Sequence, residues 1–151
     1  MLQGRKEYLS EASAIAVEYL TSGPAGFFLL IESSQIDWAC HGNHADYLIT
    51  EMQDFDRTIG RVLDFAQRDG NTLVIVTGDH ETGGFSLSAK SEGEGENCYP
   101  DYSVIAPRFT STDHSAALVP VFAFGPGAER FSGVYENTEI FHKITRLLGV
   151  D

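Results

Sequence analysis

The stretch GFFLLIESSQIDWACH, residues 26–41, joins an unbroken apolar run to a group of acidic and imidazole side chains. An apolar residue at every position of 26–31 predicts a strand covered on both faces, as in the centre of a parallel sheet. Glu32 follows this run directly. Asp37 and His41 are four residues apart, so one helical turn would point both side chains at the same place. We therefore expect a buried strand that ends beside a short helix carrying polar groups.

The chain on either side of this stretch predicts helices and strands in the order of an α/β domain. Apolar residues at helical spacing over 7–20 and 44–69 predict two helices, and Gly70 stands where a helix C-cap is expected. The segments TLVIVT, 72–77, and VPVFAFG, 119–125, are two more apolar strands. The predicted fold class is α/β, a layered sandwich with a largely parallel central sheet flanked by helices.

Three further segments complete the predicted domain. Asn137 is expected to cap a closing helix, and GGFSLS, 83–88, reads as a short edge strand. Residues 88–103 are acidic, contain glycine and lack periodicity, which predicts a mobile surface loop. The length of 151 residues is that of one ordinary domain.

Charge and cysteine content exclude some classes of partner. The net charge of −12, from 22 acidic and 10 basic residues, argues against a nucleic-acid binder, which needs a basic face. No run is long enough to span a bilayer, and the first ten residues lack the apolar core of a signal peptide. Cys40 and Cys98 allow one disulfide at most, and the sequence leaves both that bond and the compartment open. We expect Cys40 to be a small buried thiol rather than a metal ligand.

Two more acid and imidazole pairs lie next to the predicted strands. Asp79 and His80 follow the strand over 72–77, and Asp113 and His114 precede the strand over 119–125. Ligands of open α/β sheets bind beyond the carboxyl ends of the strands, so these segments are expected to share one rim. Zinc binds imidazole nitrogen and carboxylate oxygen. Each pair alone is as well explained by a turn cap or a surface histidine, and their joint placement is what favours a metal site.

Four segments together resemble the alkaline phosphatase family. In the family's order they are IESSQIDWACHGNHA, GNTLVIVTGDHETGG, TDHSAALVPVFAFGPGA and NTEIFHKI. The resemblance implies the alkaline phosphatase-like fold, with residues 1–151 a single partial domain from the C-terminal portion of the family's catalytic domain. It implies a zinc- and magnesium-dependent phosphomonoester hydrolase, acting on small-molecule substrates in a homodimeric parent enzyme that is periplasmic or extracellular.

The resemblance also implies six metal ligands shared among three sites. They are Asp37, His41 and His114 for a first zinc, Asp79 and His80 for part of a second zinc, and Glu32 for magnesium. The first zinc site is expected to be the only one complete within this chain. His44 matches no ligand of the family, and Trp38 stands where it could shape the rim of the site.

The family's nucleophilic serine, in an Asp-Ser-Ala setting, has no counterpart in this sequence, so no catalytic residue is assigned. Four serines near the motifs, Ser33, Ser34, Ser111 and Ser115, are expected to be turn or cap hydroxyls. The isolated chain is therefore expected to be weak or inactive. Two alternatives stay open, a non-catalytic metal-binding module and a related superfamily hydrolase such as a phosphodiesterase or sulfatase. The natural substrate is not predicted.

Overall fold

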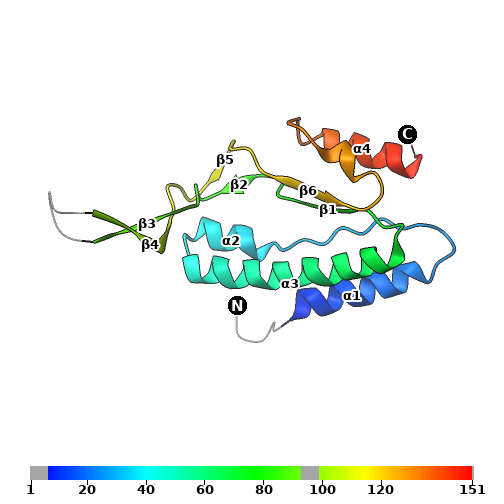
Figure 1. Cartoon of the computed structure of the whole chain (residues 1–151), viewed down its shortest axis with the longest axis horizontal. Helices are drawn as coiled ribbons and strands as arrows, with labels where there is room; N and C mark the ends of the chain where they lie inside the picture. Colours follow the sequence, from blue (N-terminus) through cyan, green and yellow to red (C-terminus); the bar gives the residue numbers. More distant parts are fainter. Residues whose placement is uncertain (1–6, 93–98, 151) are drawn as a thin grey trace.

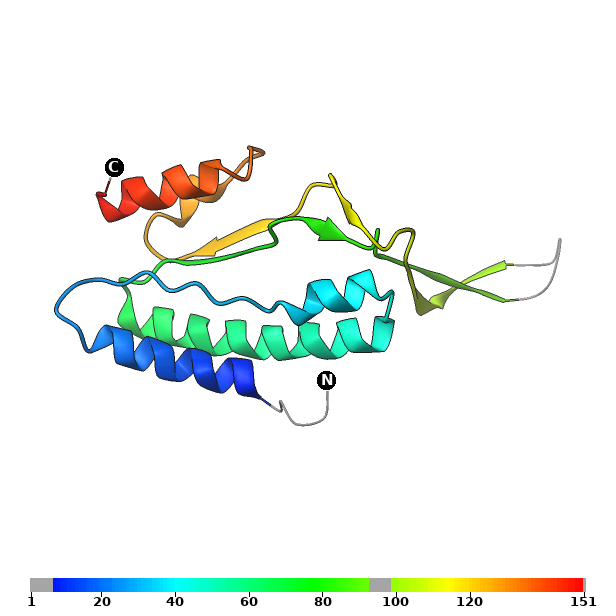
Figure 2. The same ribbon diagram turned by 180° about the vertical axis from the view of Figure 1, so that it is seen from behind.

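The computed structural model describes residues 7–92 and 99–150, which form helices on both sides of short strands (Figure 1). The helices are α1 (Tyr8–Thr21), α2 (Gln35–His41), α3 (Ala45–Asp69) and α4 (Glu139–Leu148), and η2 (Ala128–Phe131) is a 3-10 turn. The strands are β1 (Val74–Thr77), β2 (Glu81–Thr82), β3 (Ser86–Glu92), β4 (Tyr99–Arg108), β5 (His114–Ser115) and β6 (Val121–Phe124). Helices α1 and α3 lie on one side of β1 and β6, and α4 lies on the other (Figure 2). The α/β class is confirmed.

The helices predicted from apolar spacing form with nearly the expected bounds. Gly70 ends α3 in the left-handed conformation, with φ of 70°, and its N–H donates to the carbonyl of Ala66 at 2.9 Å. The cap of α4 is Thr138, one residue later than the expected Asn137. Within the described residues, no helix combines the length and the apolar character needed to cross a membrane.

A largely parallel central sheet is not confirmed. The described strands form three separate antiparallel pairs, β1 with β6, β2 with β5 and β3 with β4. Residues 26–31, expected to be the central parallel strand, are not part of any of these pairs. An apolar run predicts which side chains need cover, but it does not specify the direction or the identity of a backbone partner.

Residues 26–31 and β1 both line a groove of about 890 Å³. Side chains of α3, η2 and α4 also line this groove. Phe28 and Leu30 are 62% and 79% exposed, and Phe122 on β6 is 64% exposed. The apolar side chains predicted to be buried on both faces of a sheet therefore have cover on only part of their surface.

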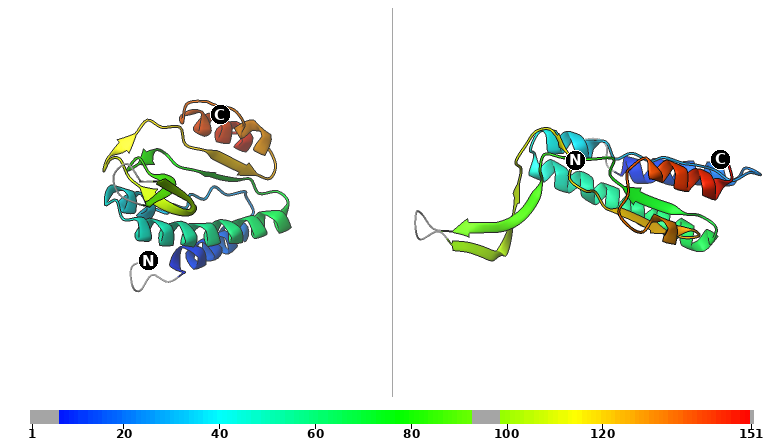
Figure 3. Two further views of the ribbon diagram at one scale, coloured as in Figure 1. Left: turned by 60° about the vertical axis from the view of Figure 1, so that its left-hand side comes forward. Right: turned by 90° about the horizontal axis from the view of Figure 1, so that it is seen from above.

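The loop expected over residues 88–103 is mostly a β-hairpin instead. Strands β3 and β4 pair antiparallel, and this hairpin projects from one end of the molecule (Figure 3). The acidic and glycine content suggested a loop, but aromatic and β-branched residues of β4, such as Tyr102 and Ile105, favour a strand. Backbone hydrogen bonds between β3 and β4, rather than contacts with a core, hold this hairpin together. Residues 93–98 lie outside the described residues.

Gly70 and Gly60 offer a matched pair of substitutions in α3. A Cβ atom at either position meets nothing within 4 Å, so only the backbone conformation differs. Gly70→Ala should lower the free energy of unfolding by about 1 kcal/mol, because alanine is strained at positive φ. Gly60→Ala, inside the helix, should raise it by about 0.5–1 kcal/mol. Urea unfolding measures both, and equal effects would contradict the assigned cap.

Candidate metal centre

The antiparallel pair of β2 and β5 brings two of the predicted motifs together. Thr82 pairs with His114 and Glu81 with Ser115. The next residue, Gly83, extends the contact: its N–H donates to the carbonyl of Asp113 at 3.0 Å, and its own carbonyl accepts from the N–H groups of 110 and 111. With φ of 83° and a Cβ position only 2.9 Å from the Cys40 carbonyl oxygen, this site requires glycine.

A small apolar core lies under these motifs and holds α2 against them. Ala39, Cys40 and Leu48 are buried, which joins α2 to α3. Phe85, after β2, and Phe109, before β5, pack against this core, and their ring centroids are 5.1 Å apart. The core therefore contains residues from all three segments that carry candidate ligands.

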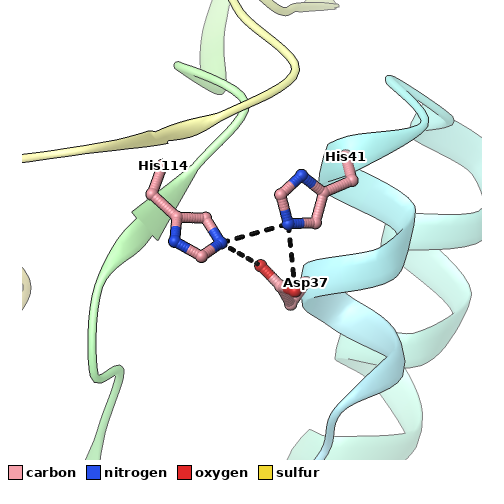
Figure 4. Close-up of side chains that lie close together, drawn as sticks. All are labelled: Asp37, His41 and His114. Atoms are coloured by element: carbon pink, nitrogen blue, oxygen red, sulfur yellow. Dashed lines mark hydrogen bonds and ion pairs between the residues drawn. The ribbon is translucent and has the colours of Figure 1, made fainter.

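Asp37, His41 and His114 converge as predicted (Figure 4). The first two lie one turn apart on α2, and His114 comes from β5. Nε2 of His114 is 3.1 Å from Nε2 of His41 and 3.6 Å from Oδ1 of Asp37. Nε2 of His41 is 3.4 Å from Oδ2 of Asp37. The three side chains are between 35% and 48% exposed, so the cluster has an open face.

A backbone carbonyl determines which nitrogen of His41 faces the cluster. Nδ1 of His41 lies 2.5 Å from the carbonyl oxygen of Thr112, which can only accept a hydrogen bond. Nδ1 therefore carries the proton, and neutral His41 presents the lone pair of Nε2 to His114 and Asp37. This is the arrangement commonly found around metal-ligating histidines.

The cluster can be compared with the ligands of a tetrahedral divalent ion. Zinc bonds of about 2.0–2.2 Å place neighbouring ligand atoms about 3.3–3.6 Å apart. The two imidazole nitrogens are 3.1 Å apart, and Asp37 approaches His41 with Oδ2 at 3.4 Å and His114 with Oδ1 at 3.6 Å. With one ligand atom from each residue, the three atoms lie within 4.8 Å of one another, which is wider than that range. Two facing imidazole nitrogens and one carboxylate match the donor types that zinc prefers. The residues present therefore suit a divalent metal ion by their donor types and by their convergence.

The ring of His80 lies next to this cluster. The His80 ring stacks on that of His114, with centroids 3.6 Å apart. Nε2 of His80 is 3.3 Å from Oδ2 of Asp79, whose side chain is 87% exposed. Glu32 is exposed and does not belong to the group of converging ligand atoms. Of the six predicted ligands, three converge, and His80 contacts this group through its ring.

Cys40 lies beneath the cluster as a free, buried thiol, as expected. Burial, followed by the nearby carboxylates of Asp37 and Glu81, raises the pKa of this thiol. A thiolate ligand is therefore disfavoured. Trp38 is exposed beside the cluster, as expected for a rim residue. Cys98 lies outside the described residues.

Sequence reasoning missed three residues that shape the site. Thr82 donates a hydrogen bond to Oδ1 of Asp37 at 2.6 Å, Thr112 orients His41, and Gly83 joins the two loops. Only the Gly-Gly pair after Thr82 carried a signal, since such pairs mark turns with positive φ. Among the serines near the motifs, Ser111 accepts from the N–H of Asp113 at 2.9 Å, a turn contact of the expected kind.

Comparison with known proteins shows which family this chain belongs to. The alkaline phosphatase family model matches residues 2–101 and 90–150. The chain belongs to the alkaline phosphatase family. Alkaline phosphatase 4 of Bacillus subtilis is 29% identical over 199 aligned residues, covering 93% of this chain and 43% of the relative. Streptomycin-6-phosphate phosphatase of Streptomyces griseus is 34% identical, covering 94% of this chain and 35% of the relative.

Solved alkaline phosphatases share the backbone of this chain. That of the Antarctic bacterium TAB5 is 53% identical with a TM-score of 0.91, covering 99% of this chain and 43% of that chain. A variant of the TAB5 enzyme with Mg bound in its M3 site matches with a TM-score of 0.93 and 52% identity, over the same shares of the two chains. The enzyme of the psychrophile Shewanella sp. is 26% identical with a TM-score of 0.80, covering 93% of this chain and 50% of that chain. The chain thus spans about half the length, or less, of these relatives.

The Glu81 carboxylate gives a pH test of the β2–β5 contact. A hydrogen bond donated by Ser115, with a second from the N–H of Phe85, lowers the pKa of Glu81. The stabilisation is therefore present above the ordinary pKa of glutamate and is lost as the pH falls through the folded value. Ser115→Ala should raise the Glu81 pKa towards its ordinary value, as followed by NMR titration. Ser111→Ala is the control, and an equal rise there would contradict the assignment.

Proposed function

We propose that this chain supplies the metal-ligand part of the active site of a metal-dependent phosphomonoester hydrolase. The observation that carries the proposal is the convergence of Asp37, His41 and His114, whose ligand atoms lie within 4.8 Å of one another. Membership of the alkaline phosphatase family supports the reaction class. The related streptomycin-6-phosphate phosphatase, named for a phosphorylated compound, is consistent with a monoester substrate.

The six predicted ligands retain their separate roles in this proposal. Asp37, His41 and His114 hold a first zinc ion, Asp79 and His80 supply part of a second site, and Glu32 contributes to a magnesium site. Two divalent ions about 3.5–4 Å apart would stabilise both the entering and the leaving oxygen of a phosphoryl transfer. Magnesium prefers oxygen ligands and keeps several waters, which suits a single exposed carboxylate.

The charge of the site makes bound cations necessary for this substrate. The chain carries a net charge of −12, and the cluster itself contributes the carboxylates of Asp37 and Asp79. A phosphate dianion would be repelled by these groups alone. In their neutral form the histidines would contribute lone pairs, which add affinity for a cation without adding charge of either sign. The site therefore suits an anionic substrate only when cations occupy it.

We propose that the remainder of the alkaline phosphatase fold packs into the groove between residues 26–31 and β1. The TAB5 enzyme has the same backbone over 99% of this chain, which corresponds to 43% of that enzyme. Exposed Phe28 and Leu30 would gain apolar cover there, and the unpaired backbone of their segment would gain strand partners. The Asp-Ser-Ala nucleophile expected from the resemblance does not occur in this sequence, so the complementary part must supply it.

Assembly and location follow from the same proposal. We expect the complete enzyme to be a homodimer and to be exported to the periplasm or the medium, as the family resemblance implies. Sedimentation of the complete enzyme and fractionation of the source cells test these two points separately from the metal chemistry.

Zinc binding to the chain alone tests the first metal site. Calorimetric titration of metal-free protein with Zn²⁺ should detect one high-affinity site, and His114→Ala should weaken it by at least about 100-fold, because one of three ligands is lost. His142→Ala, an exposed histidine on α4, is the control and should bind as the wild type does. Absence of zinc-specific binding, or unchanged affinity in His114→Ala with the fold intact by circular dichroism, would overturn the assignment.

Hydrolysis tests the reaction class. The chain alone should not hydrolyse a chromogenic phosphomonoester, because it lacks the nucleophile. Mixing it with the portion of the TAB5 enzyme that it does not match should produce turnover that chelation abolishes and that Asp37→Asn in this chain reduces by at least about 100-fold.

Phosphodiester and sulfate ester substrates serve as controls in the same mixture. Faster turnover of either one would favour the related superfamily hydrolases. One bound zinc with no turnover in any mixture would favour the non-catalytic metal-binding module.

A further inference from the structure

Thr82 is a buried residue, only 7% exposed, whose hydroxyl lies between two motifs that carry candidate ligands. Its Oγ1 is 2.6 Å from Oδ1 of Asp37 and 3.1 Å from Nδ1 of His80. The backbone of Thr82 also pairs with His114 across β2 and β5. One residue thus contacts the side chains of two candidate ligands and the backbone of a third.

The hydroxyl has a single hydrogen, and this limits the protonation of its neighbours. An ionised carboxylate only accepts hydrogen bonds, so Thr82 donates its hydrogen to Asp37. Oγ1 can then only accept from Nδ1 of His80, which must therefore carry a hydrogen. In neutral His80 the lone pair consequently lies on Nε2, on the side of Asp79.

We propose that Thr82 is a positioning residue that holds Asp37 in place and selects the Nδ1–H tautomer of His80, thereby linking the two zinc sites. The chemistry parallels that of His41, where the Thr112 carbonyl fixes the same tautomer. The Thr82 hydroxyl differs in that it acts on ligands of both sites at once. The functional consequence rests on the proposed function, whereas the tautomer itself does not.

Removing the hydroxyl separates this role from simple packing. Thr82→Val keeps the size and β-branching of the side chain, but it leaves Oδ1 of Asp37 without this donor and Nδ1 of His80 without this acceptor. Thr82→Ser restores the hydroxyl. Thr58→Val is the matched control, because Thr58 is 1% exposed and its hydroxyl donates to the carbonyl of Asp54 in α3, away from the cluster.

The first measurement uses the metal-free chain with ¹⁵N-labelled histidine, at about pH 8.5, where an ordinary histidine is neutral. Long-range ¹H–¹⁵N spectra distinguish the two tautomers. His80 should be the Nδ1–H form in the wild type, Thr82→Ser and Thr58→Val, and a mixture of both forms in Thr82→Val. The second measurement is Zn²⁺ titration, in which Thr82→Val should weaken zinc affinity by about 10–100-fold while the other two variants remain within a few-fold of the wild type.

Several outcomes would decide the question. Wild-type His80 found as the Nε2–H form would overturn the proposal without any variant, even if Thr82→Val fails to fold. A pure Nδ1–H form together with unchanged zinc affinity in Thr82→Val would overturn it as well. If the wild type binds no zinc but the tautomer shift occurs, the proposed function fails and the positioning of His80 by Thr82 stands.

Discussion

The candidate metal centre depends on the antiparallel contact between β2 and β5. This contact is only two residues long on each side, yet it places His114 within hydrogen-bonding distance of His41, which is 73 positions away in sequence. Bringing such distant segments together costs loop-closure entropy, and two backbone pairs alone offset only a small part of that free-energy cost. The backbone bonds of Gly83 and the apolar core around Ala39 supply the remaining stabilisation.

Main-chain and hydroxyl groups then orient the ligands. The Thr112 carbonyl sets the tautomer of His41, and the Thr82 hydroxyl bonds to Asp37 and His80. Two imidazole nitrogens only 3.1 Å apart at an open face are unfavourable neighbours when both present lone pairs. A cation between them would remove this repulsion, and without a cation Nε2–H of His114 can donate to Nε2 of His41.

The sequence predicted the helices and the shared direction of Asp37 and His41 from local patterns, whereas His114 joined them through the resemblance to the alkaline phosphatases. Apolar spacing specified α1 and α3, and the four-residue interval between Asp37 and His41 specified a shared helical face. The largely parallel sheet predicted from the apolar run of residues 26–31 is not confirmed, since no local pattern identifies the strand partner of that run. The hairpin of β3 and β4 was missed because acidic composition suggested a loop, although strand pairing does not require an apolar face.

The ligand cluster and the apolar groove are supported by different parts of the chain. The core under the cluster consists of Ala39, Cys40 and Leu48 with the partly buried Phe85 and Phe109, none of which lines the groove. The cluster can therefore assemble while Phe28 and Leu30 remain exposed. Its geometry is set by short-range backbone bonds rather than by a completed sheet. It follows that the convergence of the ligand cluster depends only on the described contacts and not on the groove being filled.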